Sequence, residues 1–207
     1  MSVIAVETAR ERSRQDTRRR LMAAAADVFG ESGFTVATTA AIAARAGVAV
    51  GTLYLHFGDK EGIARAVALD TFEELRARLR AAVERTHANV EAAARAHAEA
   101  LVDFVADPST RGRLLFANDA PGLRNDLFDA MAAAQEAHLR ERRRDGYFRA
   151  DIDATAAAQA LVGMQSRLLM WWLEHPRRAT RRTIVDTLAK LRLSGIHTPR
   201  TKTRISS

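Results

Sequence analysis

The sequence predicts an all-helical protein, in which a small N-terminal domain of three short helices packs on a larger helical bundle. Ala, Leu and Arg, which have high helix propensity, dominate the composition, and only 4 of the 207 residues are proline. Apolar residues recur at helical spacing through most of the chain, and no segment shows the alternation typical of a strand. With 47% hydrophobic residues the chain can bury a substantial core.

The first helices are read from their caps and apolar faces. Asp16 is the expected N-cap of a helix from Thr17, which should end at Gly33 because glycine adopts the left-handed conformation without strain. A second helix is expected from Thr38 to Gly47 and a third from Val50 to Phe57. A fourth should begin after the cap Asp59, at Lys60, and end near Thr86.

The body should contain further helices separated by Pro, Gly and Asp. We expect helices at Asn89–Ala106, at Arg111–Asn118, from the turn 119–122 to about Asp145, from the cap Asp153 to His175, and at Arg178–Ser194. The predicted organisation is a disordered basic arm (1–16), a three-helix domain (17–60), a larger helical domain (61–195) and a disordered tail (196–207).

Composition excludes several classes of protein. The absence of cysteine excludes disulfide scaffolds, thiolate metal sites and thiol nucleophiles. The longest apolar stretch, Leu161–Leu173, is broken by Gln165, Ser166 and Arg167 and falls short of the roughly 18 residues of a membrane span. No apolar signal core follows the N-terminus, so we expect a cytoplasmic protein without a membrane partner.

The chain is basic, with a formal net charge of +7. This charge favours an anionic partner such as nucleic acid, although an arginine-rich surface without such a partner would give the same number. One cluster precedes the predicted reading domain: Arg10, Arg12, Arg14, Arg18, Arg19 and Arg20. A second cluster, near the C-terminus, is interpreted as a solvated helix face and tail.

Residues 38–57 have the pattern of a helix-turn-helix. Ile42, Ala46, Val48 and Leu53 are spaced to form a small core, and Gly47 stands where the chain must turn sharply. The second helix would then present its outer face to the major groove of DNA. The expected DNA contacts are Thr38, Thr39, Arg45, Val50, Gly51, Thr52, Tyr54, Leu55, His56 and Lys60.

The string from Gly47 to Glu61, with its pattern Gly-x-x-x-Gly-x-Leu-Tyr-x-x-Phe-x-x-Lys-Glu, resembles the signature of the tetracycline-repressor (TetR) family of transcriptional regulators. The resemblance covers residues 18–63. It implies DNA contacts for Thr39, Thr52, Tyr54, His56 and Lys60, and structural roles for Gly47, Leu53 and Phe57.

The sequence departs from the family pattern at three positions. Ala49 stands where a Ser or Thr cap is common, and Ala40 stands where some relatives have a basic residue. Leu55 replaces a polar residue, so it either contacts a thymine methyl group or covers the core.

The helix from Asp153 to His175 is apolar almost all round, so it should be buried against both its own domain and a second chain. Small residues on this helix would permit close approach across a two-fold axis, and the last helix adds apolar residues. The resemblance also implies a homodimer through these two helices. The expected dimer contacts are Ala156, Ala160, Gly163, Arg167, Ile184, Leu188 and Leu191.

The resemblance further implies a repressor that a small, largely apolar effector releases from a palindromic operator. Candidate residues for the effector site are Phe104, Phe116, Asn118, Phe128, Met131, Gln135, Met164, Gln165, Trp171 and Trp172. Each of these is also an ordinary candidate for the core or the dimer interface.

Two alternative functions are an enzyme and a basic protein that coats DNA. An enzyme is disfavoured because the sequence lacks the common dinucleotide, phosphate-loop and zinc-protease motifs, and the pair Glu84 and His87 has no second pair to complete a di-iron site. We therefore expect no cofactor and no metal. The other rival is a basic protein that coats DNA with little sequence preference.

Overall fold

A computed structural model describes residues 9–86, 89–107, 111, 112, 115, 121–144, 146 and 148–196. Within them the chain forms helices and no strand. The helices are α1 (Ala9–Val36), α2 (Thr39–Ala46), α3 (Val50–Phe57), α4 (Lys60–Glu84), α5 (Val90–Ala106), α6 (Pro121–Arg144), α7 (Ala154–Glu174) and α8 (Arg181–Ile196). The predicted all-helical fold class is confirmed.

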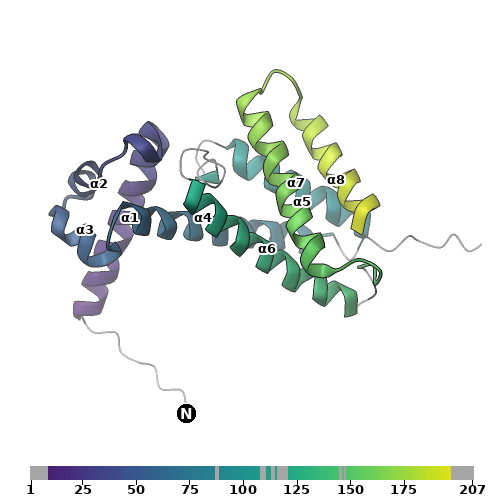
Figure 1. Cartoon of the computed structure of the whole chain (residues 1–207), viewed down its shortest axis with the longest axis horizontal. Helices are drawn as coiled ribbons and strands as arrows, with labels where there is room; N and C mark the ends of the chain where they lie inside the picture. Colours follow the sequence, from purple (N-terminus) through teal and green to yellow (C-terminus); the bar gives the residue numbers. More distant parts are fainter. Residues whose placement is uncertain are drawn as a thin grey trace, which may run out of the picture.

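The helices form two groups joined by α4. Figure 1 shows α1, α2 and α3 at one end and α5 to α8 at the other, with α4 running between them. The first group packs its core, including Leu21, Ile42 and Leu53, against Ile63 and Val67 of α4. Further along the same helix, other side chains join the core of the second group.

Most predicted helix boundaries agree with the structure because their caps form. The hydroxyl of Thr38 accepts from the N–H of Ala41, and the carboxylate of Asp59 accepts from the N–H of Gly62. Asn89 and Asp153 cap α5 and α7 in the same way. The side chain of Ala49, in contrast, gives α3 no cap.

The start of α1 corrects one prediction. The helix begins at Ala9 and not at Thr17, so Asp16 lies inside the helix, where it pairs with Arg19 at 2.8 Å. Residues 10–16 are all exposed. They lack the apolar periodicity on which the prediction relied, and helix propensity alone carries the helix through them. The helical geometry is interrupted at Gly33, which has a φ of 76°.

Two later boundaries also differ. The helix predicted after the turn 119–122 begins at Pro121, a position where the fixed φ of proline suits the first turn. The last helix begins at Arg181, where the hydroxyl of Thr180 accepts from the N–H of Thr183, and it includes Gly195. Most of the predicted helix Arg111–Asn118, residues 1–8 and the tail from 197 lie outside the described residues.

In the described part of the chain, no single helix has both the length and the hydropathy of a membrane span; only α2 and α3 taken together, bent by 104°, reach that length and composition.

The junction between α3 and α4 depends on the absence of a side chain at Gly62. A Cβ atom there would collide with the backbone carbonyl oxygen of Phe57, the last residue of α3. Because the neighbouring atom belongs to the backbone, no rotation of a side chain can relieve the contact.

We therefore expect Gly62→Ala to displace α3 from α4 and to destabilise the protein by about 1–3 kcal/mol, as overpacking does. Gly30→Ala is the matched control. A Cβ there meets nothing within 4 Å, and the substitution within α1 should be neutral or stabilising by about 0.5–1 kcal/mol. Urea unfolding of both variants checks this, and equal midpoints would show that the junction tolerates the methyl group.

Candidate nucleic-acid interface and interior cavity

The helix-turn-helix has the small core that the sequence predicts. Ile42 and Leu53 are fully buried, Ala46 is buried, and Val48 packs against them half-buried. Gly47 has a φ of 65° and its N–H bonds to the end of α2, which closes the turn between the two helices. The core thus fixes which side of α3 faces outward.

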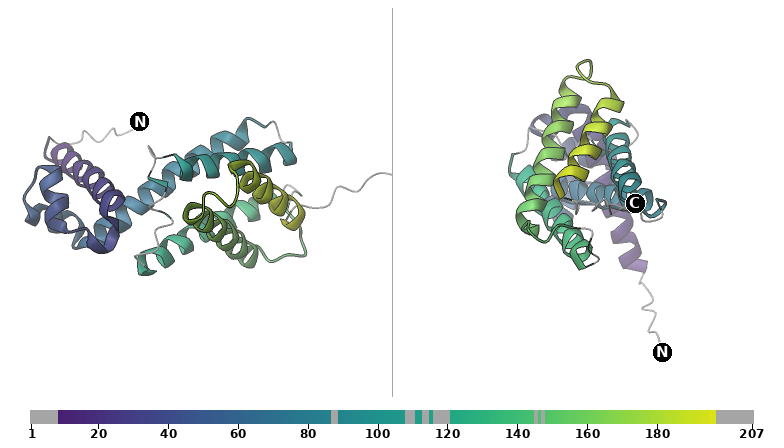
Figure 2. Two further views of the ribbon diagram at one scale, coloured as in Figure 1. Left: turned by 90° about the horizontal axis from the view of Figure 1, so that it is seen from above. Right: turned by 90° about the vertical axis from the view of Figure 1, so that its right-hand side faces the viewer.

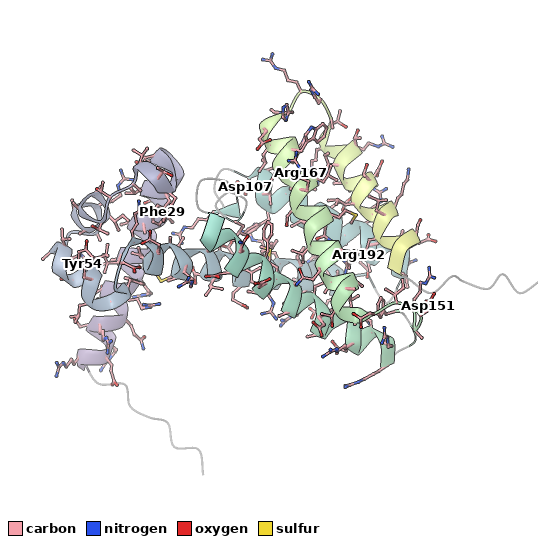
Figure 3. The ribbon with its side chains drawn as sticks, viewed as in Figure 1. Phe29, Tyr54, Asp107, Asp151, Arg167 and Arg192 are labelled. Carbon is pink, nitrogen blue, oxygen red and sulfur yellow. The ribbon has the colours of Figure 1, made fainter. Side chains whose placement is uncertain are left out.

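The outer face of α3 carries most of the predicted reading residues. Leu55 is 81% exposed and Tyr54 49% exposed, while Val50 and Gly51 are also exposed. Figure 3 places Tyr54 at the end of the molecule opposite α7 and α8. The exposure of Leu55 decides one open alternative, since this side chain does not cover the core.

A hydrogen bond joins the first helix of the motif to the second. The hydroxyls of Thr39 and Tyr54 lie 3.2 Å apart, so the two side chains are held on one surface. Thr52, on the same helix as Tyr54, is half-buried, and the hydroxyl oxygen of Thr38 is engaged as the cap of α2. The hydroxyls of Thr39 and Tyr54 therefore form a polar pair that joins α2 to α3.

The predicted role of Lys60 needs correction. Its ammonium group donates to the carbonyls of Phe34, Ala37 and Thr35 at 3.0, 3.2 and 3.4 Å, and it lies 4.5 Å from the centre of the Phe34 ring. The side chain thus binds the backbone that follows Gly33 and does not extend freely toward a DNA phosphate. A cation at this position satisfies carbonyls that the end of a helix leaves without partners.

Arg45 is exposed but paired. Its guanidinium donates two hydrogen bonds to Glu31 at 2.6 and 2.8 Å. The hydrogen bond lowers the pKa of the Glu31 carboxyl and raises the pKa of Arg45. The pair joins α2 to α1 and leaves little net charge at this point of the surface.

The N-terminal arginine cluster divides into two kinds. Arg18 lies over the ring of Phe57 at 4.5 Å and donates to the carbonyl of His56, whereas Arg20 donates to the carbonyls of Ala46 and Gly47. These two arginines thus brace the helix-turn-helix. Arg10, Arg12, Arg14 and Arg19 are exposed on the first turns of α1, so the predicted basic arm is helical from Ala9 onward.

His56 adds no positive charge near neutral pH. Partial burial and the nearby charges of Arg14 and Arg18 lower the pKa of its imidazole. The ring is therefore neutral at pH 7, and its nitrogens can only donate or accept hydrogen bonds.

A cavity of about 790 Å³ lies in the body and is lined by α4, α5, α6, α7 and Arg192 of α8. Of the predicted effector residues, Met131, Gln135 and Gln165 line it. Phe104 and Trp172 are instead buried in the core, and Phe128 and Trp171 pack against that core. Met164 packs against a separate cluster, which Leu139 and Phe148 help to form. Phe116 and Asn118 lie outside the described residues.

Sequence reasoning missed the basic residues of this cavity, which include His97, His138 and Arg192. One signal was available. Arg192 follows Ile184 and Leu188 at four-residue intervals, so it is a charged residue on the apolar face of α8. Among the described residues no three His, Asp or Glu side chains gather as metal ligands would, and His87 lies outside them.

The predicted dimer residues divide between the core and the surface. Ala156, Ala160, Gly163 and Arg167 form an exposed stripe along α7, and Leu191 of α8 is 48% exposed. Ile184 and Leu188, also predicted to lie at the dimer interface, are buried within the protomer, where α8 packs on α5, so their side chains are not exposed to a second chain. Figure 2 shows α7 and α8 side by side at the end of the body.

The contacts of Lys60 predict how Lys60→Met behaves. Loss of three carbonyl contacts should lower the stability of the protein by about 1–3 kcal/mol, measured by urea unfolding. The salt dependence of DNA binding should stay the same, because a direct phosphate contact would change the slope of log K against log salt by about 0.9. A variant that is as stable as the wild type, but whose DNA binding depends less steeply on salt, would instead indicate that Lys60 contacts a DNA phosphate.

Comparisons with known proteins agree with this geometry. The model of the bacterial regulatory proteins of the tetR family matches residues 21–67, which include the helix-turn-helix. The transcriptional activator FasR of Mycolicibacterium smegmatis is 30% identical over 91% of this chain and 87% of its own length. The regulator UidR of Escherichia coli is 40% identical over 35% of this chain and 37% of its own.

Solved structures extend the agreement to the body. The regulator TylP of Streptomyces fradiae superposes with a TM-score of 0.64 at 29% identity, over 91% of this chain and 90% of its own. SmeT, the repressor of a multidrug efflux pump of Stenotrophomonas maltophilia, has the same fold, with a TM-score of 0.68 at 21% identity over 89% and 94% of the two chains. The chain belongs to the TetR family of transcriptional regulators, which bind DNA and are not enzymes.

Proposed function

We propose that two copies of this chain bind a palindromic operator through residues 17–60, repress transcription there, and are released by a small molecule held within residues 61–195. The observation that carries the proposal is the outer face of α3. Tyr54 and Leu55 stand exposed on a helix whose inner side is fixed by the buried Leu53. A rigid helix with an exposed outward face is what insertion into a major groove requires.

The chemistry of that face favours base contacts of two kinds. The hydroxyls of Tyr54 and Thr52 can bond to base edges or phosphates, and the exposed methyl groups of Leu55 fit the methyl group of thymine. The exposed arginines at the start of α1 supply sequence-independent attraction to phosphates, and one of them, Arg14, lies close enough to His56 of α3 to lower the pKa of its imidazole. Arg45 and Lys60 contribute less to that attraction, because both are already engaged within the protein.

The exposed surface of α7 supports the proposal that a dimer binds two half-sites of DNA. The exposed stripe from Ala156 to Arg167 consists mostly of small side chains, which permit the close approach of a second α7. Such pairing places two copies of α3 on one molecule, and half-sites on one face of B-form DNA lie about 34–36 Å apart.

The contacts of α4 support coupling between ligand binding in the cavity and DNA binding by α3. The side chains of Phe72, Leu75 and Leu79 on this helix line the cavity, while Ile63 and Val67 pack in the core of the helix-turn-helix. A ligand that contacts α4 therefore acts on the element that positions α3. It changes DNA binding only if it binds one placement of α4 more tightly than the other.

Repression is the simpler mode for this geometry. A dimer seated on an operator blocks access to the DNA beneath it and needs no further surface. Activation is the second candidate, because the relative FasR is named as an activator. A reporter gene placed behind the selected operator distinguishes the two modes: expression rises on deletion of a repressor and falls on deletion of an activator.

The reading face is tested by Tyr54→Phe and Thr52→Ala. Operators are first selected from random DNA. Each variant should bind them about 2- to 10-fold more weakly, because it lacks one hydrogen bond to DNA, and it should remain a folded dimer. The wild type should prefer the operator over random DNA by about 1,000-fold or more. Unchanged footprints of both variants would contradict the assignment of α3. A steep salt dependence without operator preference would instead indicate a DNA-coating protein.

The dimer surface is tested by Ala160→Arg, which places a charged side chain on the stripe of α7. We expect monomers in sedimentation experiments and the loss of the palindromic footprint. Ala133→Arg, on an exposed position of α6, adds the same charge outside the stripe and should leave the dimer intact. A dimer that survives Ala160→Arg would place the interface on another surface.

A further inference from the structure

The cavity contains a buried cation, Arg192, for which the described part of the chain provides no counter-ion. Arg192 is only 8% exposed, its Nη1 has no hydrogen-bond partner, and it forms no ion pair with any described residue. Figure 3 marks its position on α8, in the body. Burial lowers the pKa of its guanidinium to about 10, so the group stays charged at neutral pH. A buried, unpaired charge is costly unless something pairs with it.

Two further polar groups of the cavity also lack partners. Nε2 of His97, on α5, and Nε2 of Gln135, on α6, have none among the described residues. The side chain of Gln165, on α7, also interacts with the His97 ring, and this interaction raises the pKa of His97. Burial, together with the nearby Arg192, lowers the pKa of His97 well below its usual value, so the ring is neutral. Side chains from three helices thus offer hydrogen-bonding groups to the same space.

The rest of the lining is mainly apolar. Phe72, Leu75, Leu79, Leu101 and Leu169 contribute to it, and a volume of about 790 Å³ suits a small organic molecule. Of the charged residues in the lining, Arg80, Glu84 and Glu141 are exposed, and Arg76 is paired with Glu73. The buried charge of the cavity is therefore the single cation of Arg192.

We propose that the cavity binds an amphipathic carboxylate, whose anionic group pairs with Arg192 and accepts a hydrogen bond from Gln135 while its apolar body lies along Phe72, Leu75 and Leu101. This inference rests on the proposed ligand-binding function of residues 61–195 and names the chemical class of the ligand.

The charge balance favours a carboxylate over a phosphate ester. One guanidinium beside a neutral His97 neutralises a monoanion, and its planar fork matches the two oxygens of a carboxyl group. A phosphate dianion would leave one negative charge that Arg192 does not neutralise. The remaining basic residues of the lining, such as Arg142, are only partly buried.

The test uses the full-length protein without DNA and two matched pairs of probes: decanoate with decan-1-ol, and 2-naphthoate with 2-naphthalenemethanol. Titration calorimetry should give at least 10-fold tighter binding of the acid in one pair or both. Arg192→Met should abolish that preference and leave the affinity for the alcohol unchanged. Arg182→Met removes an arginine from the same helix whose side chain is 89% exposed, and should behave as wild type.

Three results would overturn the inference. These are equal affinity for acid and alcohol in both pairs, an acid preference that survives Arg192→Met, and tighter binding of decyl phosphate than of decanoate. Arg192→Met should fold and melt at the same or a higher temperature, because removing an unpaired buried charge relieves its desolvation. Arg192→Gln serves as a second variant that retains polarity without charge.

The outcome is separable from the proposed function. A protein that selects an operator but shows no acid preference overturns the ligand class alone. A protein whose acid preference depends on Arg192 but that selects no operator supports the ligand class and overturns the repressor.

Discussion

One helix serves two hydrophobic cores, and the rest of the structure depends on this sharing. The first part of α4 buries Ile63, Ala64 and Val67 beneath the reading helices, and the next part buries Ala68, Phe72 and Leu75 in the body. The group formed by α1, α2 and α3 is small, and small domains bury too little apolar surface to be robust alone, so α4 supplies the surface that this group lacks. Helix α4 therefore packs against both groups and connects them.

The link between the two groups is reinforced on the surface. Arg65 of α4 donates to a carboxylate oxygen of Asp126 on α6 at 2.5 and 3.0 Å. Both side chains are about half exposed, so the pair contributes on the order of 0–1 kcal/mol and cannot lock α4 in place. The same holds for the other exposed ion pairs, which leaves the apolar contacts of α4 as the main constraint on the position of α3.

Local chemistry made most of the fold predictable from the sequence. Thr38, Gly47, Asp59 and Asp153 each act through neighbours within a few residues, and the helix boundaries that they mark agree with the structure. The extension of α1 was not predictable by the same means, because Arg10 to Asp16 have no buried face to produce a pattern. Apolar periodicity in a sequence reveals a helix only when one face of that helix is buried, and this segment has no buried face.

The site was less predictable, because its residues depend on partners far away in the chain. The sequence identified Tyr54 and Leu55 as outward-facing, but it could not reveal that the ammonium of Lys60 reaches carbonyls 23 to 26 residues earlier. Similarly, aromatic residues such as Phe104 and Trp172 were as suitable for a cavity as for a core until the helices were placed. The cavity is instead lined by residues such as His97 and Arg192. The four-residue spacing from Ile184 and Leu188 places Arg192 on the apolar face of α8, but it does not reveal the cavity that this face borders.

The exposed Leu55 affects how the proposed affinity for DNA should depend on ionic strength and temperature. In the proposed binding mode, this apolar side chain, which is 81% exposed in the free protein, loses its contact with water when it enters a groove, a gain of about 25 cal/mol for each Å² removed from water. This contribution involves no release of counterions, so it persists at ionic strengths that weaken the arginine contacts. It also carries a negative heat-capacity change, so complexes on thymine-containing sites should show a more strongly curved temperature dependence than complexes on random DNA.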